Sequence, residues 1–185
     1  MRIADLTEAR GDVRRQAALL LVEGFDCPTG WPSEEQAAAE TERVLCRGFG
    51  LAALEGAVLL GWVGGLPQYD GRVWELHPLV VRRDRRLCGV GRALVSAFEE
   101  RARGRGARTF TLGTDDDCRQ TSLAGVDLYD ALPRHFAELR DLGEGHPFLF
   151  YRRLGYTVTG VMPDANGPGR PDIYMSKSAR LEDRA

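Results

Sequence analysis

The stretch DRRLCGVGRALV, residues 84–95, joins a predicted strand to a predicted helix through a turn that contains Gly89 and Gly91. The apolar run of residues 79–81 precedes it, and a helical stripe of apolar residues follows it. The first turn of a helix has unpaired N–H groups and the positive end of the helix dipole, and glycine lets a ligand approach the backbone closely. The stretch therefore predicts an anion-binding turn.

The pattern of glycines narrows the kind of anion. A Walker P-loop is absent because no Gly-Lys-Ser/Thr follows, and the dinucleotide fingerprint is absent because its third glycine is missing. A Gly-x-Gly sequence by itself also occurs in ordinary tight turns, so the turn alone leaves a purely structural role open.

The remaining sequence predicts an α+β fold with a mixed sheet. Residues 8–24, 90–104 and 147–154 are predicted helices, Ser33 is predicted to cap a helix that ends near Arg47, and residues 128–142 are expected to contain a further helix. Predicted strands cover residues 1–6, 49–54, 57–65, 73–81, 109–113, 156–161 and 172–177, and Glu55-Gly56 predicts a hairpin turn.

The composition fits one globular domain spanning residues 1–185, with 43% hydrophobic and 28% charged residues. A formal net charge of -2 argues against a nucleic-acid-binding protein. Neither a signal peptide nor an apolar run of about 18 residues is visible, so no membrane association is expected. The four cysteines are widely spaced, which predicts no metal site and favours the cytoplasm.

The turn and its surroundings resemble a known signature. Residues 86–93 fit Arg/Gln-x-x-Gly-x-Gly/Ala after a strand, which resembles the acyl-CoA signature of the GNAT N-acetyltransferases, and FYRRLGY (150–156) is similar to a late motif of that family. The resemblance implies the GNAT fold, a central sheet flanked by helices with a splayed strand pair that binds acyl-CoA. It implies acetyl-CoA as co-substrate, its pyrophosphate held by the amides of residues 87–92. The implied cofactor-binding residues are Leu79, Val80, Val81, Arg86, Leu87, Cys88, Gly89, Val90, Gly91, Arg92 and Ala93.

Three further segments resemble one branch of the family. WELHPLVV (74–81), LGTDDD (112–117) and PDANGPGRPDIYM (163–175) together are similar to the aminoglycoside 6'-N-acetyltransferases, and GWP (30–32) resembles the substrate loop of that branch. The resemblance implies acetylation of the 6'-amine of kanamycin-like antibiotics, hence resistance, and a homodimer. The sequence departs from the branch in its Arg- and Ala-rich helices and in residues 128–142.

The chemistry requires a neutral amine as nucleophile, so a base or a water relay must remove a proton. Glu75 lies at the start of the strand that leads to the glycine turn and shares one face with His77 and Leu79, because strand side chains alternate. We expect Glu75 to hold and deprotonate the amine, directly or through water; a solvated glutamate at the sheet edge is the alternative. His77 is a second candidate base, with a packing role before Pro78 as the alternative.

The leaving thiolate and the thioester need groups of their own. Backbone amides of residues 79–81 are expected to polarise the thioester carbonyl. Tyr151 occupies the position at which the family often places the tyrosine that protonates the thiolate; ordinary packing is the alternative.

An aminoglycoside carries several positive charges, so its site should be acidic. The run Asp115-Asp116-Asp117 follows a predicted strand, and Asp115 and Asp116 are the candidates to pair with ammonium groups. Trp31 and Tyr69 could line the same cleft, and Asp172 is a further candidate. An acetyltransferase of a polyamine or protein N-terminus, or a non-catalytic acyl-CoA sensor, remains an alternative.

Overall fold

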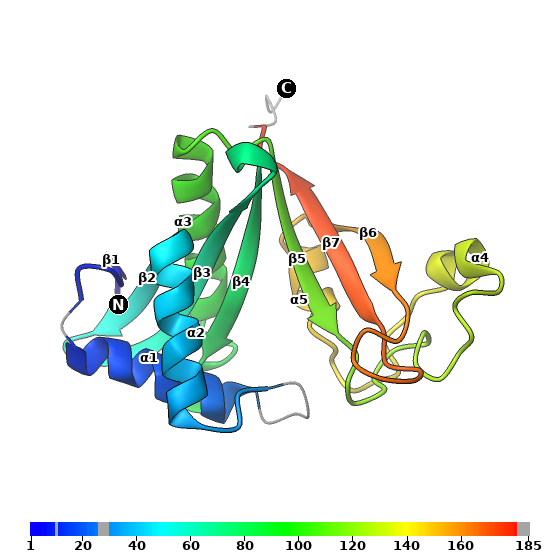
Figure 1. The fold of residues 1–185 in the computed structure, drawn as a ribbon, viewed down its shortest axis with the longest axis horizontal. Helices are drawn as coiled ribbons and strands as arrows, with labels where there is room; N and C mark the ends of the chain where they lie inside the picture. The colour runs from blue at the N-terminus through cyan, green and yellow to red at the C-terminus, as the bar shows by residue number, and fades with distance from the viewer. Residues whose placement is uncertain (10, 26–29, 181–185) are drawn as a thin grey trace. The chain divides into compact units, whose positions relative to one another are not determined.

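The computed structural model describes residues 1–9, 11–25 and 30–180, which fall into two compact units. The first unit comprises the described residues up to Phe110 together with those from Ser178 onward, and the second comprises Thr111–Lys177. Figure 1 labels the helices and strands of both.

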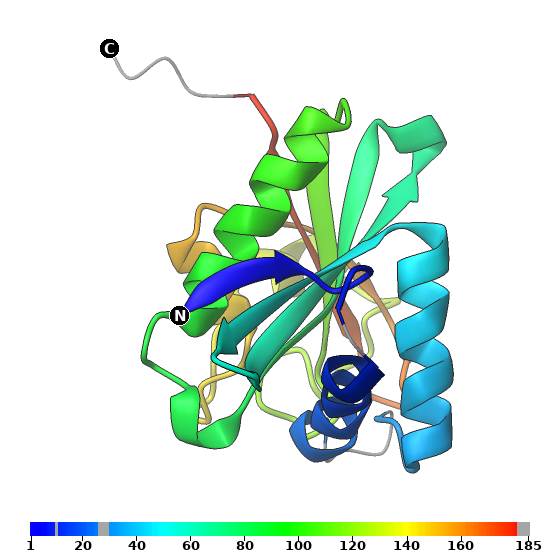
Figure 2. The same ribbon diagram turned by 90° about the vertical axis from the view of Figure 1, so that its left-hand side faces the viewer.

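The first unit is an antiparallel sheet with helices on both faces. Its strands β1 (Arg2–Asp5), β2 (Phe49–Glu55), β3 (Val58–Gln68) and β4 (Val73–Val81) are neighbours in chain order. The helices are α1 (Gly11–Gly24), α2 (Glu34–Arg47) and α3 (Val90–Gly104). Helices α1 and α2 cover one face, and α3 crosses the other (Figures 1 and 2).

The core of this unit forms between the sheet and its helices. Trp62 is fully buried, and its indole N–H donates a hydrogen bond of 3.1 Å to the carbonyl of Ala17 in α1. Along β4, side chains alternate between buried and half-buried. Glu75, His77 and Leu79 all occupy the half-buried positions, as the alternation of a strand predicts.

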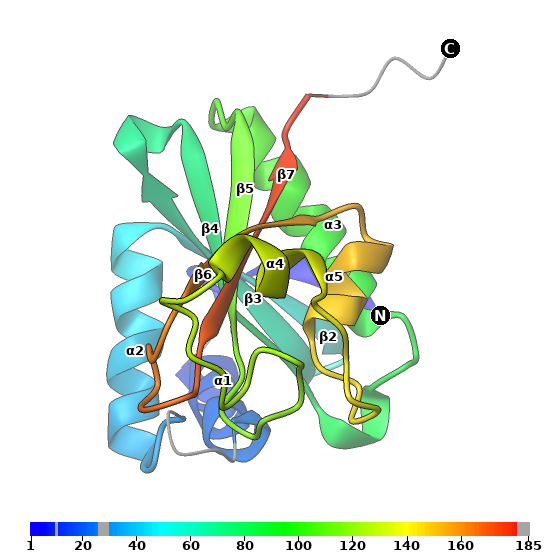
Figure 3. The ribbon, with the colours of Figure 1, turned by 90° about the vertical axis from the view of Figure 1, so that its right-hand side faces the viewer.

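The described residues of the second unit form three strands and two short helices, which Figure 3 labels. Strands β5 (Thr109–Asp115, which begins in the first unit), β7 (Asp172–Ser178) and β6 (Thr157–Met162) lie in that order, with β6 and β7 antiparallel. Helices α4 (Leu132–Ala137) and α5 (Phe148–Arg153) have six residues each.

Most predicted elements are confirmed. β4 and α3 have the predicted bounds, and Ser33 caps α2 by accepting a hydrogen bond of 3.2 Å from the amide of Gln36. Gly56 has a φ of 62° in the turn between β2 and β3, as the hairpin prediction requires.

Other bounds require correction. α1 begins at Gly11, three residues later than predicted, while β3 extends three residues further, to Gln68. β5 ends at Asp115, so this residue belongs to the strand, and Tyr156 precedes β6. The helix expected within residues 128–142 does form, as the six-residue α4. No helix among the described residues is both long and apolar enough to cross a membrane.

Candidate active site

The glycine turn between β4 and α3 is open and held in an unusual backbone conformation. Leu87 and Gly89 have positive φ values of 61° and 83°, and residues 86–89 are exposed. Gly89 occupies the N-cap of α3, and no side chain caps this helix. A Cβ atom placed on Gly89 would meet nothing within 4 Å. The first N–H groups of α3 are therefore accessible to a ligand.

The arginines around this turn divide into two groups. Arg82 pairs with Asp84, and Arg85 pairs with Glu55. Arg86 donates to the carbonyl of Val81, and neither Arg86 nor Arg92 has an acidic partner among the described residues. Two guanidinium groups beside a helix N-terminus are therefore not neutralised by an acidic side chain of the described residues. This arrangement suits the phosphates of coenzyme A.

A cavity of about 190 Å³ lies in the same unit, beside α2 and the β3–β4 hairpin. Glu75 and His77, both candidates from the sequence, line it together with Gln68 and two arginines, Arg43 and Arg47. Gln68 donates a hydrogen bond of 2.9 Å to one carboxylate oxygen of Glu75. This contact orients Glu75 and leaves its second oxygen available to another donor.

Glu40 on α2, which sequence analysis missed, connects two of the residues that line the cavity. Its Oε1 lies 2.9 Å from Nε2 of His77, and it accepts two hydrogen bonds from Arg43, of 2.6 and 2.7 Å. Burial opposes ionisation of Glu40, but the bonds from Arg43 and His77 outweigh it and lower the pKa of this carboxyl to about 2. The only sequence signal was the i,i+3 spacing of Glu40 and Arg43.

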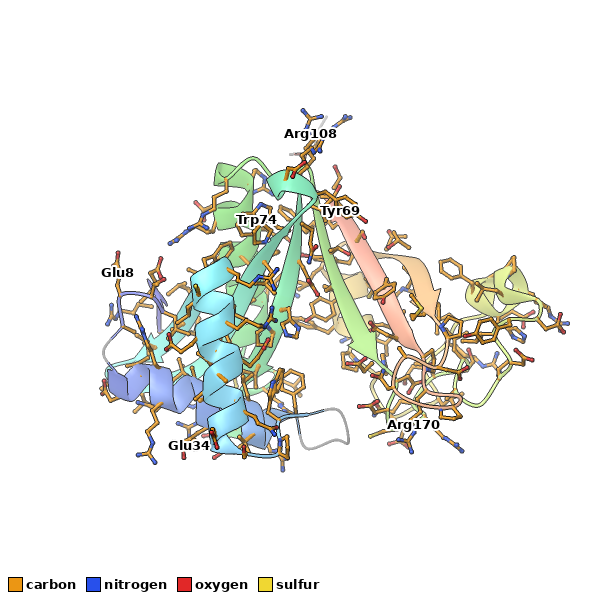
Figure 4. All side chains as sticks on the ribbon, in the orientation of Figure 1. Glu8, Glu34, Tyr69, Trp74, Arg108 and Arg170 are labelled. Carbon is orange, nitrogen blue, oxygen red and sulfur yellow. The ribbon has the colours of Figure 1, made fainter. Side chains whose placement is uncertain are left out.

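The two aromatic candidates have different positions. Trp31 is half-buried against the core, with its ring centroid 6.1 Å from that of His77 and 5.0 Å from that of Phe25. Tyr69 lies in the β3–β4 turn at 76% exposure (Figure 4). It is absent from the lining of the cavity, so the structure does not bring Tyr69 to Glu75. Residues 26–29, which precede the GWP segment (30–32) of the predicted substrate loop, lie outside the described residues.

The remaining cofactor-binding candidates of the first unit are at the end of β4: Leu79, Val80 and Val81. They pair with Val63, Trp62 and Gly61 of β3, and they precede the short 3-10 helix Arg83–Arg85 that leads into the glycine turn. The predicted donor-side residues of this unit therefore lie on one continuous strand–turn–helix segment.

Tyr151 lies on α5 in the second unit. Its side chain is buried, and its ring packs edge-on against Phe150 and Tyr156 at centroid distances of 5.0 and 5.7 Å. Burial raises the pKa of the Tyr151 phenol, so it is protonated at neutral pH. Its hydroxyl makes no hydrogen bond within the described part of the chain, which leaves this proton uncommitted.

The aspartates of the second unit have different roles. Asp116 is fully buried, and its carboxylate accepts hydrogen bonds from the amides of Gln120 and Thr121 and from the Thr121 hydroxyl. A carboxylate so enclosed cannot reach a solvent-borne ammonium, so we correct the expectation for Asp116 and assign it to folding of this loop.

Asp115 and Asp172, in contrast, lie on one face of the second unit. Asp115 is exposed at the end of β5 and accepts a hydrogen bond of 2.6 Å from Asn166. A Cβ atom on Gly113, two residues earlier in β5, would lie 2.6 Å from Oδ2 of Asp172. Because residues i and i+2 of a strand share a face, the two carboxylates share it too.

His146 is a further residue that the sequence analysis missed. It is fully buried, and its Nδ1 accepts a hydrogen bond from the amide of Phe148. Its Nε2 lies 3.1 Å from the carbonyl oxygen of Asp115. Burial lowers the pKa of His146, so the neutral ring donates from Nε2. This bond ties α5, which carries Tyr151, to the end of β5.

Comparisons with known proteins identify the family. Residues 18–131 match the acetyltransferase (GNAT) family. A crystal structure of an aminoglycoside 6'-N-acetyltransferase complexed with coenzyme A is 37% identical, with a TM-score of 0.89 over 98% of this chain and 99% of that one. The aminoglycoside 6'-N-acetyltransferase from Enterococcus faecium is also 37% identical, with a TM-score of 0.87 and the same coverage.

A third structure, aminoglycoside 6'-acetyltransferase type Ii, is 32% identical with a TM-score of 0.74, over 98% of this chain and 99% of that one. The comparison with curated proteins gave no match. Among the described residues, no group of three or more His, Cys, Asp or Glu side chains could hold a metal ion. The predicted α+β GNAT fold is confirmed, and the chain belongs to the GNAT family of acetyltransferases.

Proposed function

We propose that the protein transfers the acetyl group of acetyl-CoA to the 6'-amine of aminoglycoside antibiotics and so confers resistance to them. The observation that carries this proposal is 37% identity over 98% of the chain to aminoglycoside 6'-N-acetyltransferases, one of them complexed with coenzyme A. The GNAT family alone would leave the acceptor amine open.

On the donor side, the amides of residues 87–92 bind the pyrophosphate of coenzyme A. The open turn at Gly89 and the uncapped N-terminus of α3 support this role. The charges of Arg86 and Arg92, which no acidic side chain of the described residues neutralises, support it as well. Backbone amides of Leu79 to Val81 polarise the thioester carbonyl, since these residues lead directly into the turn.

On the acceptor side, Glu75 holds the 6'-ammonium and removes one proton, directly or through water. Its position in the wall of a cavity and its fixed orientation by Gln68 support this role. The neutral amine attacks the thioester carbonyl, an amide N–C bond forms as the C–S bond breaks, and the proton that the nitrogen loses on forming the amide passes to water. Asp115 and Asp172, which share a face, attract further ammonium groups of the polycation.

Tyr151 acts on the leaving group by donating its phenol proton to the thiolate. Burial keeps the pKa of the phenol high and the phenol protonated at neutral pH, and its hydroxyl has no competing partner among the described residues. The raised pKa makes Tyr151 a weak acid, so proton donation must accompany C–S cleavage, when charge on sulfur develops.

The compartment and assembly are also part of the proposal. Cys46, Cys88 and Cys118 are exposed free thiols, which fits the reducing cytoplasm. A homodimer is proposed because β6 is an edge strand of its unit, with Met162 47% exposed. Sedimentation at micromolar concentration should give twice the 20.4 kDa chain mass.

Release of free thiol from acetyl-CoA, followed with kanamycin, spermidine and a basic peptide in parallel, tests the acceptor class. Kanamycin should give the highest kcat/KM of the three. Turnover confined to spermidine or to the peptide would instead assign the chain to another acceptor amine, and no turnover with any of them would refute an acetyltransferase of these cationic amines.

A further inference from the structure

Three charged or ionisable side chains of the first unit, Glu40, Arg43 and His77, form a chain of contacts beside the cavity, and Glu75 lines the same cavity. Glu75 and His77 come from β4, and Glu40 and Arg43 come from α2. Arg43, His77 and Glu75 line the cavity. Glu40 does not line it, has only 14% of its side chain exposed, and contacts both Arg43 and His77. A largely buried carboxylate that contacts residues lining a site, without lining it itself, is placed to position them.

The first contact decides where the charge of Arg43 lies. Two donor nitrogens of Arg43 meet both oxygens of Glu40 at 2.6 and 2.7 Å, a bidentate geometry. These bonds raise the pKa of Arg43, and the negative charge of Glu75 adds to that rise. Arg43 and Glu75 therefore attract each other electrostatically. Within the described residues, however, Arg43 forms no ion pair with Glu75.

This geometry has a consequence for a cationic substrate. If Arg43 paired with Glu75, it would neutralise the carboxylate that the proposed function assigns to the 6'-ammonium, and it would put a positive charge at the same place. The bidentate contact with Glu40 holds Arg43 back from that pairing.

The second contact fixes the proton of His77. Since Glu40 is an ionised carboxylate that can only accept, the 2.9 Å contact requires His77 to carry a hydrogen on Nε2. Nδ1 is then the ring nitrogen that Glu40 leaves available. The ring of Trp31, 6.1 Å away between centroids, limits movement of the imidazole on another side.

We propose that Glu40 is a positioning residue of the acceptor site, which holds Arg43 away from Glu75 and keeps the hydrogen of His77 on Nε2. The kinetic part of this inference rests on the proposed function. The part that concerns the tautomer of His77 can be tested without a substrate.

A double-mutant cycle with kanamycin and acetyl-CoA tests the restraint on Arg43. In Glu40→Gln one acceptor oxygen and the negative charge are lost, so Arg43 can turn to Glu75, and the KM for kanamycin should rise roughly 1.5- to 5-fold, as for a partly exposed ion pair. The KM for acetyl-CoA should not change. In an Arg43→Ala background the same Glu40→Gln change should have little effect on the KM for kanamycin.

Glu34→Gln is the matched control. Glu34 is on the same helix and accepts a hydrogen bond of 2.7 Å from Arg15, but it does not line the cavity, so its loss should alter neither KM. If Glu40→Gln raised the KM for kanamycin equally in the wild-type and Arg43→Ala backgrounds, the effect would not act through Arg43. That result would overturn the proposal that Glu40 holds Arg43 away from Glu75.

Ring ¹⁵N NMR of the wild-type protein and the Glu40→Gln variant tests the other half without any substrate. The wild type should show His77 protonated at Nε2, and Glu40→Gln should give a mixture of tautomers because an amide can also donate. Protonation of wild-type His77 at Nδ1 alone would overturn the inference. Should kanamycin not be a substrate, the proposed function fails, while this spectrum still decides the role of Glu40.

Discussion

Replacing Gly89 by alanine separates backbone strain from ligand binding, since the structure shows no clash at this position. Gly89 has a φ of 83°, and a Cβ atom there would meet nothing within 4 Å. A left-handed conformation costs a non-glycine residue roughly 1–2 kcal/mol. The free energy of unfolding should fall by that amount, and the melting temperature by about 2–8 °C for a chain of this length.

Gly56→Ala provides a matched control for this strain. Gly56 lies in the turn between β2 and β3 with a φ of 62°, and a Cβ atom there would also meet nothing within 4 Å. Its replacement should therefore cost a similar free energy of unfolding. It should leave acetyl-CoA binding unchanged, because it removes no amide of the glycine turn.

Isothermal titration of acetyl-CoA into both variants is the decisive assay. If alanine at position 89 leaves the left-handed conformation, at least one amide turns away from the pyrophosphate. The loss of a hydrogen bond to a charged group costs roughly 1.5–3 kcal/mol, which is about a 10- to 150-fold rise in Kd. Equal affinities of Gly89→Ala and Gly56→Ala for acetyl-CoA would refute the role of the turn.

Three other variants or conditions test separate parts of the structure. Asp116→Ala should lower the free energy of unfolding in urea by roughly 2–4 kcal/mol, since it strands buried donors of Thr121; a loss no larger than that of exposed Asp115→Ala would contradict the structural assignment. The folded pKa of Glu40, about 2, lies below its ordinary value of 4.5, so its stabilisation is present above pH 4.5 and is lost as the pH falls toward 2. The difference in stability between wild type and Glu40→Gln should thus shrink across that window, by about 1 kcal/mol after solvent screening, and a constant difference would argue otherwise. Tyr151→Phe should slow turnover about 10²–10⁴-fold and less with a thioester of a more acidic thiol, whereas equal slowing with both donors would exclude Tyr151 as the general acid.

The segments with regular periodicity could be predicted from sequence because local rules decide them. The alternation in β4, the apolar stripe of α3 and the Ser33 cap each depend on neighbouring residues, and each is confirmed. Residues 128–142 offer no such pattern, and only α4 forms there.

The site was harder to predict where its contacts are distant in sequence. Glu40 and His77 are 37 positions apart, and His146 and Asp115 are 31 apart, so no local pattern indicates either contact. Asp116 could not be told from Asp115 by sequence, because its burial depends on the loop that folds back to Thr121. Nor could hairpin geometry reveal that Tyr69 stays exposed.

The regiochemistry of kanamycin acetylation tests the central claim most directly. The protein would be incubated with acetyl-CoA and kanamycin, and the purified product examined by two-dimensional NMR. The account predicts a single acetyl group on the 6'-nitrogen, with the 6'-methylene resonances shifted. Acetylation at the 3-amine instead, or no acetylated kanamycin at all, would contradict it.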